Sequence, residues 1–239
     1  MQIIKKVIRS TVAKLGYDII RRPPDAFSDM KRFVPPGVRP LILDIGANVG
    51  QSAKRFKQVF PLSVVHCFEP SRDTFDQLKQ NIAREKGVFA WQCALGSAVG
   101  KQRFIENTYS DMSSFLELSK TGWGKVKKNE TVDVMTVDRF LSDHAIASVD
   151  ILKSDTQGYD FEVFKGAEQA MRENRIGLIY FEFIFSEMYR GLPPFDEVYR
   201  FLVDRSFLLV SIYDFHRQNN LADWADVLFV NREYHRRNA

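Results

Sequence analysis

Residues 41–50 read LILDIGANVG, a short apolar run that passes directly into a turn containing two glycines. The helical spacing of residues 50–59 follows at once. Gly46 permits a tight turn and lets the backbone approach a ligand closely, and Gly50 does the same where the next helix begins. In an open α/β sheet, ligands bind in the crevice at the carboxyl ends of the strands. This stretch therefore predicts a strand, a ligand-binding turn and a helix.

The same alternation continues along the chain after that turn. Short, nearly continuous apolar runs separated by helices are typical of βαβ units, and hence of a parallel sheet covered on both faces. Because only a short polar segment joins the last two strands, we expect them to be antiparallel neighbours at the edge of the sheet. The expected strands are 41–45, 64–69, 87–93, 150–155, 176–183, 207–213 and 226–230, and the expected helices are 50–59, 71–86, 160–173 and 195–205.

One region departs from this rhythm. Residues 96–148 are too long for a single crossover, and segments 100–107 and 131–137 alternate as strands do. We interpret the region as an insertion over the ligand-binding edge of the sheet. The sequence thus predicts one domain over residues 39–239, preceded by a basic amphipathic helical extension over residues 1–38.

The glycine turn matches neither common nucleotide-binding pattern. The spacing is not the dinucleotide fingerprint, and no Gly-Lys-Ser/Thr follows as in a P-loop. The acid Asp44 before the turn suits a cofactor with a cationic amino-acid end. At the end of the second strand, Glu69 could accept both hydroxyls of a ribose, although a plain strand-end acid is the alternative. Ala94 and Leu95 end the third strand, where they could hold an adenine ring or simply pack in the core.

Four segments in this order resemble the FkbM-type methyltransferase family: 44–50, Glu69-Pro70, 94–96 and 152–167 (LKSDTQGYDFEVFKGA). The resemblance covers roughly residues 38–231. It implies an S-adenosylmethionine-dependent O-methyltransferase of the class I, Rossmann-like α/β fold, with a seven-stranded, mostly parallel sheet and an antiparallel edge strand. The chain departs from the family at Gln157, where the commoner motif has a glutamate; a glutamine there can orient a hydroxyl but cannot act as a base.

The resemblance also assigns residues to the cofactor. In the family a serine pair lies close to the cofactor, which makes Ser114 a plausible contact. The expected cofactor-binding residues are Asp44, Gly46, Asn48, Gly50, Glu69, Ala94, Leu95, Ser114 and Asp155.

Methyl transfer to a hydroxyl requires positioning and is helped by a general base. Three side chains follow carboxyl ends of the expected strands and are candidates for that base: Asp155, Glu182 and His216. Asp155 could instead bind the amino group of the cofactor. A divalent metal is possible through Asp155, Glu182 and Asp214, but nothing in the spacing demands it, and no metal ligand is assigned.

The family implies a sugar hydroxyl, in a glycan or lipid-linked saccharide, as the acceptor. A polyketide or other natural product is the first alternative, and a binding module that has lost catalysis is the second. Trp123, between two glycines of the insertion, could stack on a sugar face or be an indole tucked against an exposed loop.

Charge is distributed unevenly along the 239 residues, which carry a net charge of +4. Residues 1–39 carry nine basic and three acidic side chains, so the rest of the chain has a net charge of −2. A basic domain face typical of nucleic-acid binders is therefore not expected. The apolar stripe within residues 3–15 predicts a helix that packs on the domain or, through residues 1–20, lies on an anionic membrane surface. The two cysteines lie in apolar surroundings, which suits a cytoplasmic protein, with membrane association at the inner surface as a further possibility.

Overall fold

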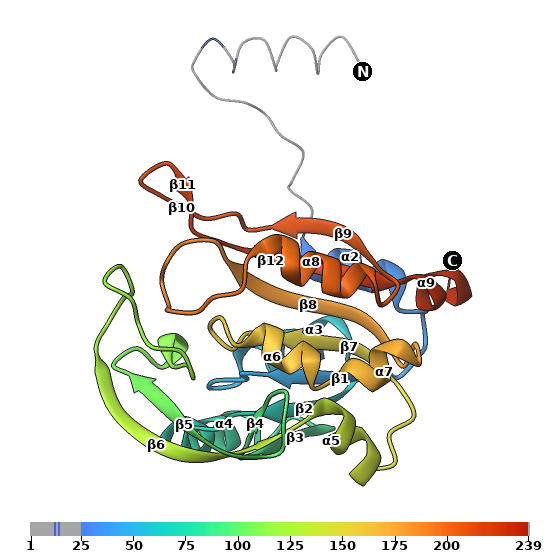
Figure 1. Ribbon diagram of the computed structural model, residues 1–239. Coiled ribbons are helices and arrows are strands. Elements are labelled where there is room, and N and C mark those ends of the chain that lie inside the picture. Colours follow the sequence, from blue (N-terminus) through green and yellow to red (C-terminus); the bar gives the residue numbers. More distant parts are fainter. Residues whose placement is uncertain (1–11, 13, 15–24, 239) are drawn as a thin grey trace.

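The computed structural model describes residues 12, 14 and 25–238, and its centre is a seven-stranded sheet (Figure 1). Its spatial order is β3-β2-β1-β7-β8-β12-β9. The strands from β3 to β8 pair in parallel, whereas β12 is antiparallel to both of its neighbours. The strands are β1 (Leu41–Ile45), β2 (Val64–Phe68), β3 (Val88–Trp91), β7 (Val149–Ser154), β8 (Ile176–Ile184), β9 (Phe207–Tyr213) and β12 (Trp224–Asn231).

This arrangement confirms the predicted class I, Rossmann-like α/β fold. It also shows which strand lies at the edge of the sheet. β9 precedes β12 in the sequence but lies at the outside of the sheet. β12 lies between β8 and β9. The antiparallel strand is therefore the penultimate one, and β9 forms the edge. Since β9 and β12 are joined by a short segment, the antiparallel pairing follows from the length of that connection.

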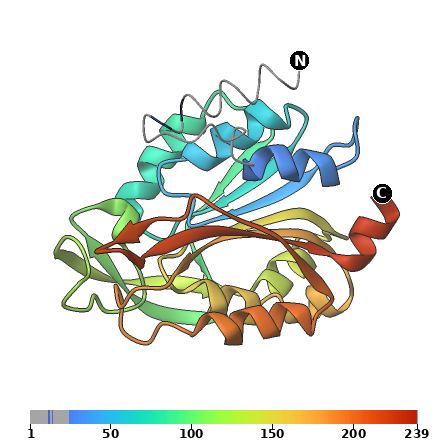
Figure 2. The ribbon, with the colours of Figure 1, turned by 90° about the horizontal axis from the view of Figure 1, so that it is seen from above.

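Helices cover both faces of the sheet, as Figure 2 shows from above. One layer packs Met30, Phe56 and Leu78 on the sheet, and the other packs Phe140, Phe164 and Leu202 on the opposite face. The first layer consists of α2 (Ala26–Phe33), α3 (Gln51–Val59) and α4 (Arg72–Ile82); the second consists of α5 (Val137–Asp143), α6 (Asp160–Lys165), α7 (Glu168–Arg172) and α8 (Phe195–Val203); α9 (Arg232–Asn238) follows β12.

The helix predicted over residues 160–173 is divided in two at Gly166. A Cβ at this glycine would lie 2.0 Å from the carbonyl oxygen of Gly96. The two backbones are therefore in direct contact where the first helix ends. The periodicity of residues 160–173 contains no signal for a contact with the distant Gly96.

The insertion forms a small second sheet beside β2 and β3. Its order is β4 (Ala94–Leu95), β6 (Val126–Met135) and β5 (Gly100–Asn107), with the short 3-10 helix η1 (Ser110–Met112) after β5. The second predicted strand of the insertion thus begins earlier than expected. Loop 108–125 and the hairpin of β10 (Arg217–Gln218) and β11 (Leu221–Ala222) project on the same side of the molecule, at the left of Figure 1.

The predicted amphipathic stripe and the membrane contact of residues 1–20 fall outside the described residues, apart from 12 and 14. The described part of the predicted extension contributes Ala26 and Met30 to the α2–α4 layer. Asp25 caps α2 by accepting from the Ser28 N–H at 3.1 Å, and the Tyr213 hydroxyl donates to Asp29 at 2.8 Å. Within the described part of the chain, no helix has the length and apolar character needed to cross a membrane.

Candidate functional site

A cavity that is partly open to solvent lies at the carboxyl ends of β1, β2 and β7. The cavity is lined by Ile45, Gly46, Asn48, Gln51, Phe68, Glu69, Pro70, Ala94, Leu95, Phe104, Ser110, Asp111, Ser113, Phe115, Asp155, Thr156 and Gln157. Six of the predicted site residues belong to this lining: Gly46, Asn48, Glu69, Ala94, Leu95 and Asp155.

The turn after β1 brings the backbone of one strand against the end of another. Gly46 has a φ of +70°, and a Cβ there would lie 1.9 Å from the carbonyl oxygen of Asp155. The glycine therefore makes room for the β7 end as well as for a ligand. Gly50, with a φ of +92°, faces Leu78 of α4, which would lie 2.9 Å from an added Cβ. Since Gly50 does not line the cavity, its smallness serves helix packing.

Asp44 lies beneath the cavity and not in its wall. Its side chain is fully buried, and the ammonium of Lys153 lies 3.1 Å from Asp44 Oδ1. Burial raises the pKa of Asp44 despite this cation. The interpretation that Asp44 touches a cationic ligand therefore does not match its position, and an indirect role through Lys153 is the arrangement that the structure offers.

Glu69 is a buried carboxylate that lines the cavity, 7% exposed. One oxygen accepts from the Asn48 N–H at 3.1 Å and the other from the Ser71 N–H at 2.9 Å. Burial raises the pKa of Glu69 to about 7, and the nearby Glu106 carboxylate adds to the rise. Each carboxylate oxygen keeps a further lone pair, so Glu69 could still accept two hydroxyl donors from a ligand.

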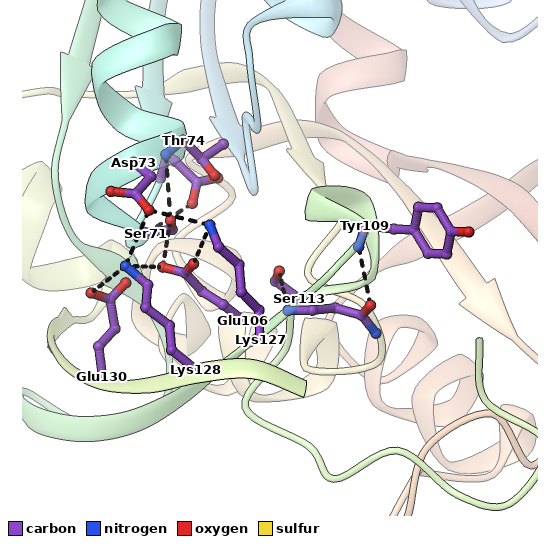
Figure 3. A network of polar contacts seen from close by, with 11 residues as sticks. Ser71, Asp73, Thr74, Glu106, Tyr109, Ser113, Lys127, Lys128 and Glu130 are labelled. Carbon is purple, nitrogen blue, oxygen red and sulfur yellow. Dashed lines mark hydrogen bonds and ion pairs between the residues drawn. The ribbon is translucent and has the colours of Figure 1, made fainter. Parts of the chain in front are cut away.

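A polar network of the insertion supports the Glu69 strand end (Figure 3). The Ser71 hydroxyl donates to Glu106 at 2.8 Å, and Lys128 lies 3.1 Å from the same carboxylate oxygen. Glu106 on β5 contacts the start of α4 through Ser71, and Lys128 on β6 does so through Asp73, 3.3 Å away. The insertion thereby fixes the position of the Ser71 N–H, which donates to Glu69.

Gln157 joins three side chains at the opposite side of the cavity. Its amide nitrogen donates to Asp155 at 3.1 Å and to Glu182 at 3.0 Å, while its oxygen accepts from the Tyr189 hydroxyl at 3.0 Å. Its backbone is in the left-handed region, with a φ of +54°. The amide nitrogen thus donates to both carboxyl groups, which an ionised carboxylate at 157 could not do because it has no hydrogen to donate.

The two carboxyl groups held by Gln157 differ in environment. Burial raises the pKa of Glu182 to about 9, and the negative charges of Asp155 and Asp226 add to the rise. Glu182 therefore holds a proton at neutral pH. The Asp155 side chain is 39% exposed and lies 3.6 Å from the Lys153 ammonium.

The structure keeps two other predicted residues out of the cavity lining. The Ser114 hydroxyl donates to the Gln157 carbonyl at 2.8 Å, so Ser114 holds the insertion loop against the turn after β7. His216 is exposed and stacks on Trp224, with ring centroids 4.2 Å apart. Within residues 25–238 and the two described residues before them, no three His, Cys, Asp or Glu side chains are grouped as a metal ion would require.

The sequence interpretation assigned no role to several residues that build the site. Lys153 carried a signal, since it is a charged side chain inside the apolar strand Val149–Ser154. The lining residues Ser110, Asp111 and Phe115 carried no signal in the sequence, because they reach the cavity only through the fold of the insertion.

The lining chemistry fits S-adenosylmethionine. Phe68, Leu95 and Phe115 offer apolar surface for an adenine, and the carboxylates of Glu69 and Asp155 offer acceptors for hydroxyl and ammonium donors. Two buried oxygens of lining residues, Asn48 Oδ1 and Thr156 Oγ1, have no hydrogen-bond partner within the described part of the chain. A polar ligand would satisfy such atoms.

Comparison with known proteins gives distant relatives that are methyltransferases. The chain is 27% identical over 166 residues to the 2-O-methyltransferase NoeI of Sinorhizobium fredii, covering 65% of this chain and 68% of that protein. It is 25% identical to the hexuronic acid methyltransferase AglP of Haloferax volcanii (65% of this chain, 59% of that protein) and 29% identical to the methyltransferase sdnD of Sordaria araneosa (54% and 61%). The matches to AglP and sdnD thus span about three fifths of those proteins.

Two solved structures share the fold. An rRNA methylase from Streptococcus thermophilus matches with a TM-score of 0.50 and 12% identity, over 89% of this chain and 98% of that one. TrmK of M. capricolum, in complex with S-adenosyl-homocysteine, matches with a TM-score of 0.50 and 7% identity, over 89% and 70%. At these identities the likeness concerns the fold, which is the class I methyltransferase fold.

The model of the methyltransferase FkbM domain matches residues 44–209, which contain the glycine turn, Glu69 and the β7 end. This match covers more than half of the chain and includes the wall of the cavity from β1 to β7. The chain therefore belongs to the FkbM methyltransferase family and is an S-adenosylmethionine-dependent methyltransferase.

Proposed function

We propose that this enzyme methylates a hydroxyl of a sugar, in a glycan or a lipid-linked saccharide. The observation that carries the proposal is the Asp155 carboxylate, which lines the cofactor cavity, is partly exposed and is held by Gln157. A carboxylate so placed can take the proton of a hydroxyl during transfer. The names of two relatives, a 2-O-methyltransferase and a hexuronic acid methyltransferase, support oxygen as the nucleophile and a sugar as the acceptor.

The proposed mechanism uses residues on both sides of the cavity. Bound S-adenosylmethionine supplies a methyl group on a sulfonium, which the acceptor oxygen attacks in line. Glu69 holds the ribose hydroxyls, and Asp155 orients the acceptor hydroxyl and accepts its proton. Gln157 keeps Asp155 in position and donates a second hydrogen bond to Glu182. With the methyl group passing from sulfur to the acceptor oxygen, Asp155 would carry away the hydroxyl proton.

Glu69 provides a prediction on cofactor binding and its pH dependence. With a pKa of about 7, its carboxyl is ionised above neutrality, and charge-assisted bonds to hydroxyls are stronger than neutral ones. We expect the affinity for S-adenosylmethionine to rise about tenfold from pH 6 to pH 8 and then level off. Glu69→Gln should lower the affinity at pH 8 by about tenfold, since a charge-assisted bond contributes roughly 1.5–3 kcal/mol. It should also remove the pH dependence.

Calorimetric titration at several pH values measures both effects. Glu162→Gln is a suitable control, because Glu162 is a partly exposed carboxyl paired with Lys165 and lies outside the cavity lining. An unchanged affinity and an unchanged pH profile in Glu69→Gln would remove Glu69 from the cofactor site.

Trp123 provides a prediction on the acceptor. Loop 108–125 contributes Ser110, Asp111 and Phe115 to the cavity, and Trp123 at its far end is 43% exposed with its ring against Trp224. Aromatic faces offer apolar area to the C–H faces of sugars. We expect Trp123→Ala to raise the KM for a saccharide acceptor about tenfold with little change in kcat. Phe89→Ala is the matched control, since Phe89 is 50% exposed on the outer strand β3.

The acceptor class is tested directly by transfer of a labelled methyl group. The purified chain would be incubated with labelled S-adenosylmethionine and separate panels of hexose glycosides, hexuronic acid glycosides, their lipid-linked forms and polyketide alcohols. Labelled methyl ethers in the saccharide panels support the proposal. Transfer to the polyketide alcohols alone would replace it by the natural-product alternative.

A further inference from the structure

Lys153 is a buried cation in the middle of the sheet, 5% exposed on β7. Its ammonium lies 3.1 Å from Asp44 on β1 and donates to the Gly46 carbonyl at 3.2 Å. The same nitrogen lies 3.6 Å from the Asp155 carboxylate. One side chain thus contacts β1, the turn that follows it and the Asp155 carboxylate at the end of β7.

The charge of Lys153 is secured by this environment. Burial alone would lower its pKa, but the carboxylates of Asp44 and Asp155 raise it well above the usual range of a lysine. Among the described residues, Lys153 is the only lysine or arginine within 4.0 Å of either carboxylate. No other lysine or arginine among the described residues could therefore pair with Asp44 or Asp155 if Lys153 were replaced.

The contact with Gly46 indicates a role beyond pairing a buried acid. If Lys153 served only to neutralise Asp44, a bond to the turn and an approach to Asp155 would not be needed. Gly46 and Asp155 both line the cavity, and their backbones are in direct contact. The ammonium joins the same two elements through a polar contact.

We propose that Lys153 is a positioning residue of the cofactor site, which ties the Gly46 turn to the Asp155 carboxylate and so fixes the position of both in the cavity wall. This inference rests on the cofactor site proposed above and does not depend on the acceptor, because its test measures cofactor binding alone.

The first test is Lys153→Met, which keeps the length of the aliphatic chain and removes the charge. We expect the affinity for S-adenosylmethionine to fall at least about tenfold. Asp44 should then take up a proton in the folded state, so its folded pKa rises further above the unfolded value. Stability should therefore decrease as pH rises from about 5 to 8, since the folded chain binds a proton that the unfolded chain has released. The titratable groups around Lys153 are Asp44, Cys67, Glu69, Asp155, Asp160 and Asp226.

The second test separates positioning from a merely structural role. In the double variant Asp44→Asn/Lys153→Met no unpaired buried charge remains, so the melting temperature and its pH dependence should return toward those of the wild type. If Lys153 positions the turn and Asp155, the cofactor affinity stays at least about tenfold lower even so. Lys101→Met, which removes an exposed lysine paired with Asp133, is the control for a lost surface charge.

The outcomes are distinct. Recovery of affinity together with melting temperature in the double variant would overturn the inference and leave Lys153 as a partner of Asp44 only. An unchanged affinity in Lys153→Met would overturn it as well. A wild-type chain that does not bind S-adenosylmethionine would instead contradict the proposed cofactor site.

Discussion

Gly46→Ala is expected to destabilise the fold by about 2–5 kcal/mol and to abolish cofactor binding at micromolar concentrations. The left-handed conformation costs an alanine roughly 1–2 kcal/mol, and forcing a methyl group into a packed site costs roughly 1–3 kcal/mol more. At Gly46 the added Cβ would lie 1.9 Å from the Asp155 carbonyl oxygen, which is backbone and cannot rotate away. The turn must therefore move away from β7, and the cavity wall moves with it.

Gly37→Ala is the control that shows the conformational cost without the steric cost. Gly37 has a φ of +81°, close to the +70° of Gly46, but an added Cβ there would contact nothing within 4 Å. Only the conformational cost of about 1–2 kcal/mol applies to it. Chemical denaturation measures the stabilities, and calorimetry measures cofactor binding. A Gly46→Ala variant no less stable than Gly37→Ala, with normal binding, would show that the two strand ends need not touch.

The sheet and its helices could be predicted from the sequence because each strand carries its own signal. Residues 41–45, 64–68 and 176–184 are nearly continuous apolar runs, which only strands buried on both faces require. The insertion of β12 between β8 and β9 had no such signal, since either order buries similar side chains. The division of the helix at Gly166 depends on Gly96, which is 70 positions away in the sequence and could not be paired with it in advance.

The candidate site was predictable to the extent that its residues follow strand ends. Glu69 and Asp155 line the cavity for that reason. Asp44 also stands near a strand end, but its side chain points under the turn to Lys153 and not into the cavity. A sequence gives the position of an acid along a strand, whereas its accessibility depends on the neighbouring strand and on which cation that strand supplies.

Asp155→Asn should produce a large loss of turnover even when the enzyme is saturated with cofactor. The amide keeps the shape of the carboxylate, and its oxygen can still accept from the Gln157 amide, now at 3.1 Å from Asp155. It cannot take a proton from the acceptor hydroxyl, so turnover at saturating cofactor should fall by roughly 10²–10⁴-fold, the usual contribution of a general base. The affinity for S-adenosylmethionine should change far less. If Asp155 instead binds the cofactor ammonium, affinity falls strongly and the saturated rate falls little.

Glu182→Gln is the matched comparison, because Glu182 accepts from the same amide nitrogen of Gln157 at 3.0 Å. With a pKa of about 9, Glu182 is already neutral near pH 7, so a neutral amide in its place should reduce turnover by no more than a few fold. If Glu182 were the base, the wild-type rate would keep rising up to about pH 9 as its proton is lost. Single-turnover rates of both variants between pH 6 and 9.5 decide between the two carboxyl groups. A large loss in Glu182→Gln together with a rate that rises to pH 9 would place the base on β8, and Asp155 would then serve only to orient the reacting groups.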